Sequence, residues 1–317
     1  MSHTNPQAQS SIRVGAIGLD SSHTFEFSRR IQKMHAEAAT PCHVTCCWDI
    51  PVDKDAAAPL RELGIRFTST LEELLSSVDA VMVLTVDGHR HFDLAINGLT
   101  RGLPTFIDKP LTCSAAQAAA LLEFTRAHNA RCYSASALRF IDRVPDFSID
   151  SLGRLISVQA SGPYQEIEQM RGLWYYACHT FELVDSIWPR AGGVRRIRAR
   201  VTDAGHHIDL EYRDGRSAVI GLDRAGTAPF TAILRGESSS IAFEASLLSS
   251  YDRLVASICR FFEGEDHAFP LENTAEIVSL IECSHKSLSR QGDWIALHEP
   301  STLPSQNEAV STHKNVS

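Results

Sequence analysis

The segment LWYYACHTFELV, residues 173–184, could place several acid–base side chains on one helix face. Tyr175, His179 and Glu182 stand at positions i, i+4 and i+7, and this spacing puts side chains on the same side of a helix. Imidazole titrates near neutral pH and suits proton transfer, which a nearby phenol could share. The pattern also fits a core helix with an aromatic stripe and a hydrogen-bonded histidine. Cys178 points in another direction and is expected in the core.

The stretch VGAIGLDSSHTFEF, residues 14–27, resembles a nucleotide-binding loop that lacks two glycines. An apolar run ends at Gly18, and a helix-like segment follows. In a dinucleotide fingerprint the second glycine admits the pyrophosphate and the third allows close helix packing. Asp20 and His23 stand at those two positions. We expect Asp20 to cap the helix and to take the amide groups that a phosphate would otherwise use.

Ser21 and Ser22 remain in this loop as hydroxyl donors, and His23 could point outward and touch a ligand. Two interpretations stay open. The loop is a dinucleotide site that relies on serine hydroxyls and helix amides, or it is a site that has given up dinucleotide binding.

Asp49 closes the second strand-like run. A carboxylate at this place can bond ribose hydroxyls and would repel a 2′-phosphate. Because Ile50 and Pro51 follow it, where a phosphate site would want Arg, the sequence favours NAD over NADP. The alternative is an aspartate that makes a turn with Pro51. Thr85 ends another apolar run, and its loop should reach the same edge of the sheet.

The segment GHRHFD, residues 88–93, raises the question of a metal. His89 and His91 could approach one ion, with oxygen from Asp87 or Asp108. A catalytic zinc needs three well-placed ligands, and no third histidine has local spacing. The sequence therefore predicts no metal site.

These residues depend on a scaffold that the alternation of segments predicts. Strand-like and helix-like runs alternate over residues 12–140, which is typical of a doubly wound parallel sheet, a Rossmann domain. A helix at about 171–188, several strand-like stretches and helices near 250–263 and 272–289 follow. We predict an α/β protein whose residues 141–299 form an α+β domain with a mostly antiparallel open sheet and helices on one face. The polar tails, 1–11 and 300–317, are expected to be disordered.

Composition narrows the class of protein. Of the 317 residues, 44% are hydrophobic, and the formal charge of −8 argues against a nucleic-acid surface. No apolar run approaches the roughly 20 residues of a membrane span. Neither end resembles a signal peptide, and the eight cysteines lie scattered without a Cys-x-x-Cys pair. We expect a cytoplasmic protein with reduced thiols and no membrane partner.

The segment IDKPLT, residues 107–112, resembles the Glu-Lys-Pro motif of the Gfo/Idh/MocA oxidoreductases, with Asp108 in place of Glu. The resemblance extends through TLEELLSSVDAVMVLT, through LRFIDRVP after the sixth strand, and to GLWYYACHTFELVD. This last segment is similar to the family's helix with Asp-x-Gly-x-His-x-x-Asp. Members transfer hydride between NAD(P) and a sugar, polyol or similar alcohol.

The resemblance implies roles for individual residues. Lys109 would bond the reacting oxygen and orient the nicotinamide, and His179 would donate or accept the proton, assisted by Tyr175 where the family has Asp. The implied substrate-binding residues are His91, Glu182 and Arg139. The implied cofactor-binding residues are Gly18, Asp20, Ser21, Ser22, His23, Asp49, Thr85, Asp108 and Lys109.

The sequence thus predicts an NAD-dependent oxidoreductase that acts on a hydroxyl or carbonyl carbon of a small molecule. A redox-neutral epimerase or eliminating enzyme would also use the cofactor. A cofactor-independent lyase or hydratase could use Lys109, His179, Tyr175 and His23, and a non-catalytic binding subunit is a further alternative. Because the open sheet face needs cover, we expect a homodimer or higher homo-oligomer.

Overall fold

The computed structural model describes residues 11–49, 54–141, 149–187, 193–245, 250–266 and 269–297. Apart from Ser11, both expected tails lie outside these ranges, as do Ile50 and Pro51.

The first sheet is parallel and has six strands in the order β3-β2-β1-β4-β5-β6. Its strands are β1 (Ile12–Ile17), β2 (Cys42–Trp48), β3 (Arg66–Phe67), β4 (Ala80–Val83), β5 (Thr105–Ile107) and β6 (Cys132–Ser134). The connecting helices are α1 (Ser22–Ala36), α2 (Lys54–Glu62), α3 (Leu71–Ser76), α4 (His91–Leu99) and α5 (Ala115–His128). Every residue of β4 is buried, because helices cover both faces of such a sheet.

The second sheet has seven strands in the order β12-β11-β7-β10-β9-β8-β13. Only the β7–β10 pair is parallel. Its strands are β7 (Leu155–Pro163), β8 (Val194–Thr202), β9 (Gly205–Tyr212), β10 (Ser217–Asp223), β11 (Phe230–Gly236), β12 (Ser240–Ala245) and β13 (Ile295–Ala296). The predicted combination of a parallel Rossmann sheet and a mostly antiparallel sheet is confirmed, while the boundaries of the two domains stay a prediction.

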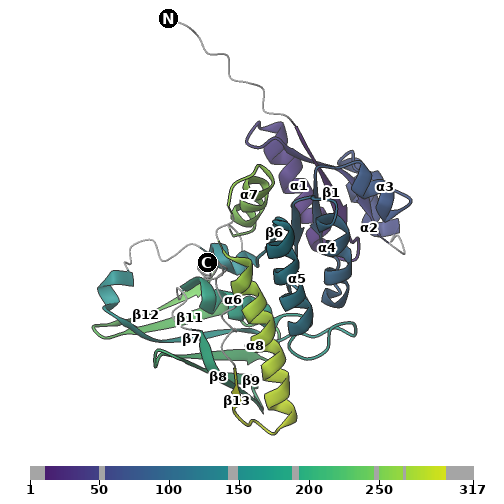
Figure 1. Cartoon of the computed structure of the whole chain (residues 1–317). Coiled ribbons are helices and arrows are strands. Elements are labelled where there is room, and N and C mark those ends of the chain that lie inside the picture. Colours follow the sequence, from purple (N-terminus) through teal and green to yellow (C-terminus); the bar gives the residue numbers. More distant parts are fainter. Residues whose placement is uncertain are drawn as a thin grey trace, which may run out of the picture.

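Two helices pack on one side of the second sheet, and a third does not. The apolar residues of α6 (Ala177–Ile187) join the core of this sheet, as do Ile277, Leu280 and Ile281 of α8 (Leu271–Ser289), and both helices lie against the sheet in Figure 1. The other apolar face of α8, with Leu271, Ala275 and Val278, packs on the first domain. In contrast, α7 (Ser250–Phe262) lies next to α1, and its Leu254, Ile258 and Phe261 belong to the core of the first sheet. The expectation that both late helices close the second domain is therefore wrong for α7, because an apolar helix face does not specify which sheet it will cover.

A short 3₁₀ turn, η2 (Ala137–Phe140), follows β6 and packs against both α6 and α7. It therefore links the end of the parallel sheet to the helix that carries His179. The helix expected from about residue 171 begins only at Ala177, so Tyr175 lies in the preceding turn.

Among the described residues, none of the helices combines the length and the apolar character that crossing a bilayer requires.

Candidate active site

The loop after β1 depends on glycine at position 18. Gly18 has φ +107°, and a Cβ there would lie 2.5 Å from the backbone nitrogen of Thr85. The next residue, Leu19, donates its N–H to the carboxylate of Asp49 at 2.9 Å. The ends of β1, β2 and β4 therefore meet closely, at the edge where ligands bind in this class of sheet.

Asp20 does not cap α1, so that expectation is wrong. Its Oδ1 accepts the backbone N–H of Val86 at 3.0 Å, in the loop after β4. The cap is Ser21, whose hydroxyl oxygen accepts the N–H of His23, because Ser21 directly precedes the first helical residue. Ser22 is exposed at that first position. Two amides of the helix start are thus occupied, because the N–H of Thr24 is donated to the carbonyl oxygen of Ser21. Asp20 itself is exposed.

His23 does not extend into solvent. Its Nδ1 lies 2.6 Å from Oδ2 of Asp108, its Nε2 lies 3.2 Å from the Tyr251 hydroxyl on α7, and its ring stacks on Phe27. Burial by itself would raise the pKa of Asp108, but His23 and the neighbouring Lys109 lower it to about 2. Asp108 is therefore ionised, and His23 joins the motif carboxylate to a helix from the far end of the chain.

Lys109 is the side chain best placed to meet a ligand. It is 9% exposed, and its Nζ lies 5.0 Å from the ring centre of Tyr175 and 6.0 Å from that of Tyr176. Burial is the largest influence and lowers the pKa of Lys109, but the charge of Asp108, together with the nearby Cys178, Tyr175 and Tyr176, outweighs it and raises the pKa. No hydrogen-bond acceptor for this ammonium lies within the described part of the chain. The buried Oδ1 of Asp108 also lacks a hydrogen-bond partner there.

His179 lies in the same site. Its Nδ1 is 2.6 Å from Oγ of Ser136, and its ring meets the edge of Tyr176 at 4.9 Å between centroids. Burial, followed by the charge of Lys109, lowers the pKa of His179 well below 6.5. At neutral pH the imidazole is therefore neutral. His179 and Tyr175, predicted to share a helix face, both lie close to Lys109, although Tyr175 is not in the helix.

His91 is fully buried. Its ring nitrogens lie 2.7 Å from the carbonyl oxygen of Pro110 and 2.8 Å from that of Thr85. It thus connects the Lys109 turn to the loop after β4. Its two ring nitrogens are engaged, so the contacts favour a supporting role over the substrate contact expected from the resemblance.

Arg139 and Glu182 form a buried ion pair, with Nε and Oε2 2.7 Å apart. A second contact joins Arg139 to Asp185 at 3.2 Å. Neither contact has the alignment of a good hydrogen bond, so charge attraction is their main effect. Burial raises the pKa of Glu182, although Arg139 opposes this. The pair lies in the interior between η2 and α6, which favours support of the site over contact with substrate.

Asp49 is buried at the end of β2, as predicted, but sequence reasoning missed its partner. Nη2 of Arg90 lies 3.1 Å from Oδ1 of Asp49. The two residues are 41 positions apart, so only the fold brings them together. Ser136, Tyr176 and Tyr251 were missed as well. Of these, Tyr176 had a signal, since it is adjacent to Tyr175.

Within the described residues, no three His, Cys, Asp or Glu side chains are grouped closely enough to hold a metal ion. His89 is exposed, and the ring nitrogens of His91 face carbonyl oxygens.

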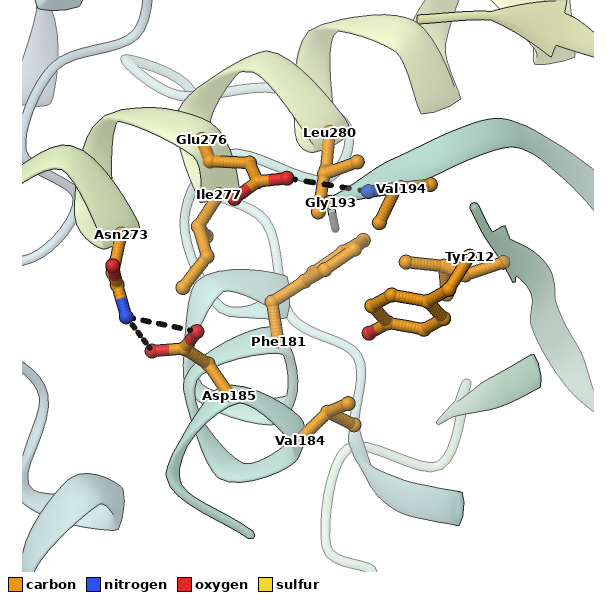
Figure 2. Close-up of a pocket in the computed structure, with 11 residues that line it drawn as sticks. Phe181, Val184, Asp185, Gly193, Val194, Tyr212, Asn273, Glu276, Ile277 and Leu280 are labelled. Carbon is orange, nitrogen blue, oxygen red and sulfur yellow. Dashed lines mark hydrogen bonds between the residues drawn. The ribbon is translucent and has the colours of Figure 1, made fainter. Parts of the chain in front are cut away.

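Figure 2 shows a separate cavity of about 30 Å³ between α6, α8 and the strands β8 and β9. Asn273 donates from its amide to Asp185 at 3.4 Å, and Tyr212 lies across the cavity. This volume holds about one water molecule, and neither Lys109 nor His179 lines it. The cavity is therefore not the candidate active site.

The strand order and the glycine-dependent loop define a Rossmann-type domain followed by an open-sheet domain. Residues 12–136 match the family model described as an oxidoreductase family with an NAD-binding Rossmann fold, GFO_IDH_MocA. This part of the chain is therefore similar to the Gfo/Idh/MocA oxidoreductases, as the Lys-Pro motif predicts. No curated protein sequence matches the chain.

Solved structures share the whole architecture. A putative myo-inositol dehydrogenase from Sinorhizobium meliloti 1021 superposes with a TM-score of 0.76 at 15% identity, over 91% of this chain and 100% of that chain. Myo-inositol dehydrogenase from Lactobacillus casei, solved with NAD(H) and myo-inositol, gives 0.75 at 14% identity, over 92% and 98%. GenD2 from gentamicin A biosynthesis, solved with NAD, gives 0.76 at 16% identity, over 92% and 97%. At these identities the similarity establishes the fold.

Proposed function

We propose that this protein is an NAD-dependent oxidoreductase that transfers hydride between the nicotinamide and a hydroxyl or carbonyl carbon of a sugar, polyol or related small molecule. The observation that carries the proposal is the Lys109 ammonium, buried and without an acceptor, beside the free Oδ1 of Asp108 and the neutral ring of His179. A buried ammonium and a buried carboxylate oxygen without partners are costly unless a ligand completes them.

The residues at the strand ends fit a dinucleotide. Gly18 keeps the backbone of β1 against Thr85 where any Cβ would clash, and Asp49 stands where a carboxylate can bond the ribose. The bound cofactor would supply or accept the hydride, and the protein would supply position and charge. The exposed carboxylate of Asp20 opposes pyrophosphate binding without closing the loop.

Lys109 and the side chains around it would have different roles at the reacting carbon. Lys109 would hold the reacting oxygen, and the ring of Tyr175 keeps its ammonium in place through a cation–π contact. Tyr176 is partly exposed and its ring stacks at 6.2 Å on the buried Phe230, so Tyr176 would offer an apolar surface to the C–H face of a sugar ring. This combination favours a cyclic polyol or a sugar as substrate.

Thermal melts with NAD⁺, NADH, NADP⁺ and NADPH test the cofactor. A ligand at about 100 times its dissociation constant stabilises by about 2.7 kcal/mol, which moves the midpoint by several degrees. We expect a shift with NAD⁺ and NADH, and we expect Lys109→Met to abolish NADH formation from any polyol that the wild type oxidises. No shift with any of the four dinucleotides would overturn the proposal and favour cofactor-independent proton chemistry.

We also propose a homodimer formed through the uncovered face of the second sheet. Ile233 on β11 is 45% exposed, and α6 and α8 occupy the other side of the sheet (Figure 1). Sedimentation at micromolar concentration tests this, and a monomer would reject it. Cytoplasmic location is part of the same proposal, because the cysteines are free thiols, which suits a reducing compartment.

A further inference from the structure

Ser136 makes four hydrogen bonds between the end of β6 and η2, and its carbonyl oxygen accepts one of them, from the N–H of Arg139 at 3.1 Å. Its hydroxyl oxygen accepts the N–H of Leu138 at 3.2 Å and lies 2.6 Å from Nδ1 of His179. Its own backbone N–H is donated to Oε2 of Glu182 at 2.5 Å. Ser136 therefore contacts α6 twice, once through His179 and once through the residue three positions further on.

The direction of the Ser136–His179 bond follows from the hydrogen atoms available. The Leu138 bond uses a lone pair of the hydroxyl oxygen, so the hydroxyl still has its one hydrogen to donate. Within the described residues, Nδ1 of His179 is the one acceptor in reach of that hydrogen. Ser136 therefore donates, and Nδ1 accepts with its lone pair.

A neutral imidazole that accepts at Nδ1 carries its proton on Nε2. The ring of His179 is neutral at neutral pH, because burial and Lys109 hold its pKa well below 6.5. Nε2 has no hydrogen-bond partner in the described part of the chain. It therefore presents an N–H and not a lone pair to a ligand.

The backbone around Ser136 is held rigidly. Glu182, which accepts the Ser136 N–H, is paired with Arg139 of η2, and both side chains are buried. The backbone that carries the Ser136 hydroxyl thus cannot move away from His179 without disturbing a buried ion pair. Outer partners of this kind commonly fix the tautomer of a functional histidine.

We propose that Ser136 is a positioning residue that holds His179 in the Nε2–H tautomer, so that His179 meets the substrate oxygen as a hydrogen-bond donor and not as a base. The role toward substrate rests on the proposed function, whereas the tautomer does not. Together with the Lys109 ammonium, the site then offers two donors to one oxygen. Two donors fit a carbonyl oxygen or an alkoxide, so the site is built to stabilise that form of the substrate.

NMR of the full chain with ¹⁵N-labelled histidine tests the tautomer without any substrate. Long-range ¹H–¹⁵N spectra distinguish protonated from unprotonated ring nitrogens, and His179→Gln assigns the signals. At pH 7 the wild type should show a neutral ring with the proton on Nε2. A proton on Nδ1, or a doubly protonated ring, would overturn the proposal even if no variant of Ser136 folds.

Three variants separate positioning from packing. Ser136→Ala should lose the single tautomer, and Ser136→Thr should restore it, because threonine keeps the hydroxyl. The matched control is Ser134→Ala at the end of β6, two positions earlier, which removes a buried hydroxyl that has no hydrogen-bond partner and should leave the His179 signals unchanged. An unchanged His179 spectrum in Ser136→Ala would overturn the proposal.

The thermal melts with dinucleotides distinguish a failure of the Ser136 proposal from a failure of the proposed function. Ser136→Ala should retain the NAD⁺ shift of the wild type, because Ser136 does not contact the loop of Gly18. A wild type with the Nε2–H tautomer and no dinucleotide shift would reject the proposed function and leave the role of Ser136 intact.

Discussion

The carboxylate of Asp20 accepts the backbone N–H of Val86 at 3.0 Å and so joins the loop after β1 to the loop after β4. A glycine at position 20 would leave that amide free and place no charge there. Asp20 therefore adds a link between two loops and a negative charge at the place where a pyrophosphate should lie. A substitution at position 20 can remove the charge and keep the hydrogen bond to Val86.

Asp20→Asn keeps an oxygen acceptor for Val86 and removes the charge. We expect NAD⁺ to bind about fivefold more tightly, since two unit charges 4 Å apart in water repel by about 1 kcal/mol. Titration by intrinsic fluorescence or calorimetry measures the change. Glu123→Gln removes an equal charge from the exposed face of α5 and should leave the affinity unchanged. Weaker binding in Asp20→Asn would mean that the carboxylate helps to bind the cofactor.

Gly18→Ala should be far more destabilising than Gly64→Ala. Both glycines have positive φ, +107° and +77°, but only Gly18 has backbone atoms within 3 Å of the added Cβ. Gly64→Ala should cost about 1 kcal/mol for the left-handed backbone alone, and Gly18→Ala about 3 kcal/mol or more because Thr85 must move. Urea unfolding gives both values. Equal losses in the free energy of unfolding would show that the loop after β4 moves easily to make room for the added Cβ.

Sequence reasoning predicted the fold well because its signals were local. Apolar runs identify strands, and a Lys-Pro motif is read directly from the chain. Sequence reasoning failed for side chains whose contacts are with residues distant in sequence. Nothing near Ser136 indicates that its hydroxyl meets His179, and nothing near Arg90 indicates that it meets Asp49. His23 could be interpreted as outward-facing because Tyr251, its partner on α7, is 228 positions away.

The stability of the protein should fall as the pH drops below 6.5, in part because of His179. The folded state lowers the pKa of His179, so below 6.5 the unfolded chain binds a proton that the folded chain refuses, and stability is lost. One such group contributes at most about 1.4 kcal/mol per pH unit. Denaturant unfolding of the wild type and His179→Gln at pH 7 and pH 5 should show a smaller difference in the variant. His89→Gln, at an exposed position, is the control and should show the wild-type difference. The same difference in His179→Gln would contradict a neutral buried imidazole.

Arg90 should influence the choice between NAD⁺ and NADP⁺. Its guanidinium lies 3.1 Å from the Asp49 carboxylate and offsets part of the negative charge that would repel a 2′-phosphate. In Arg90→Gln that charge is no longer offset, so NADP⁺ affinity should fall about fivefold more than NAD⁺ affinity, as expected for about 1 kcal/mol of charge interaction. Competitive titration of the two dinucleotides gives the ratio. Arg101→Gln removes a guanidinium that pairs with Glu72 beyond the other end of α4, and this control should keep the wild-type ratio. An equal loss of both affinities in Arg90→Gln would show that Arg90 supports the loop and does not act on the phosphate, which would leave Asp49 alone to set the preference for NAD⁺.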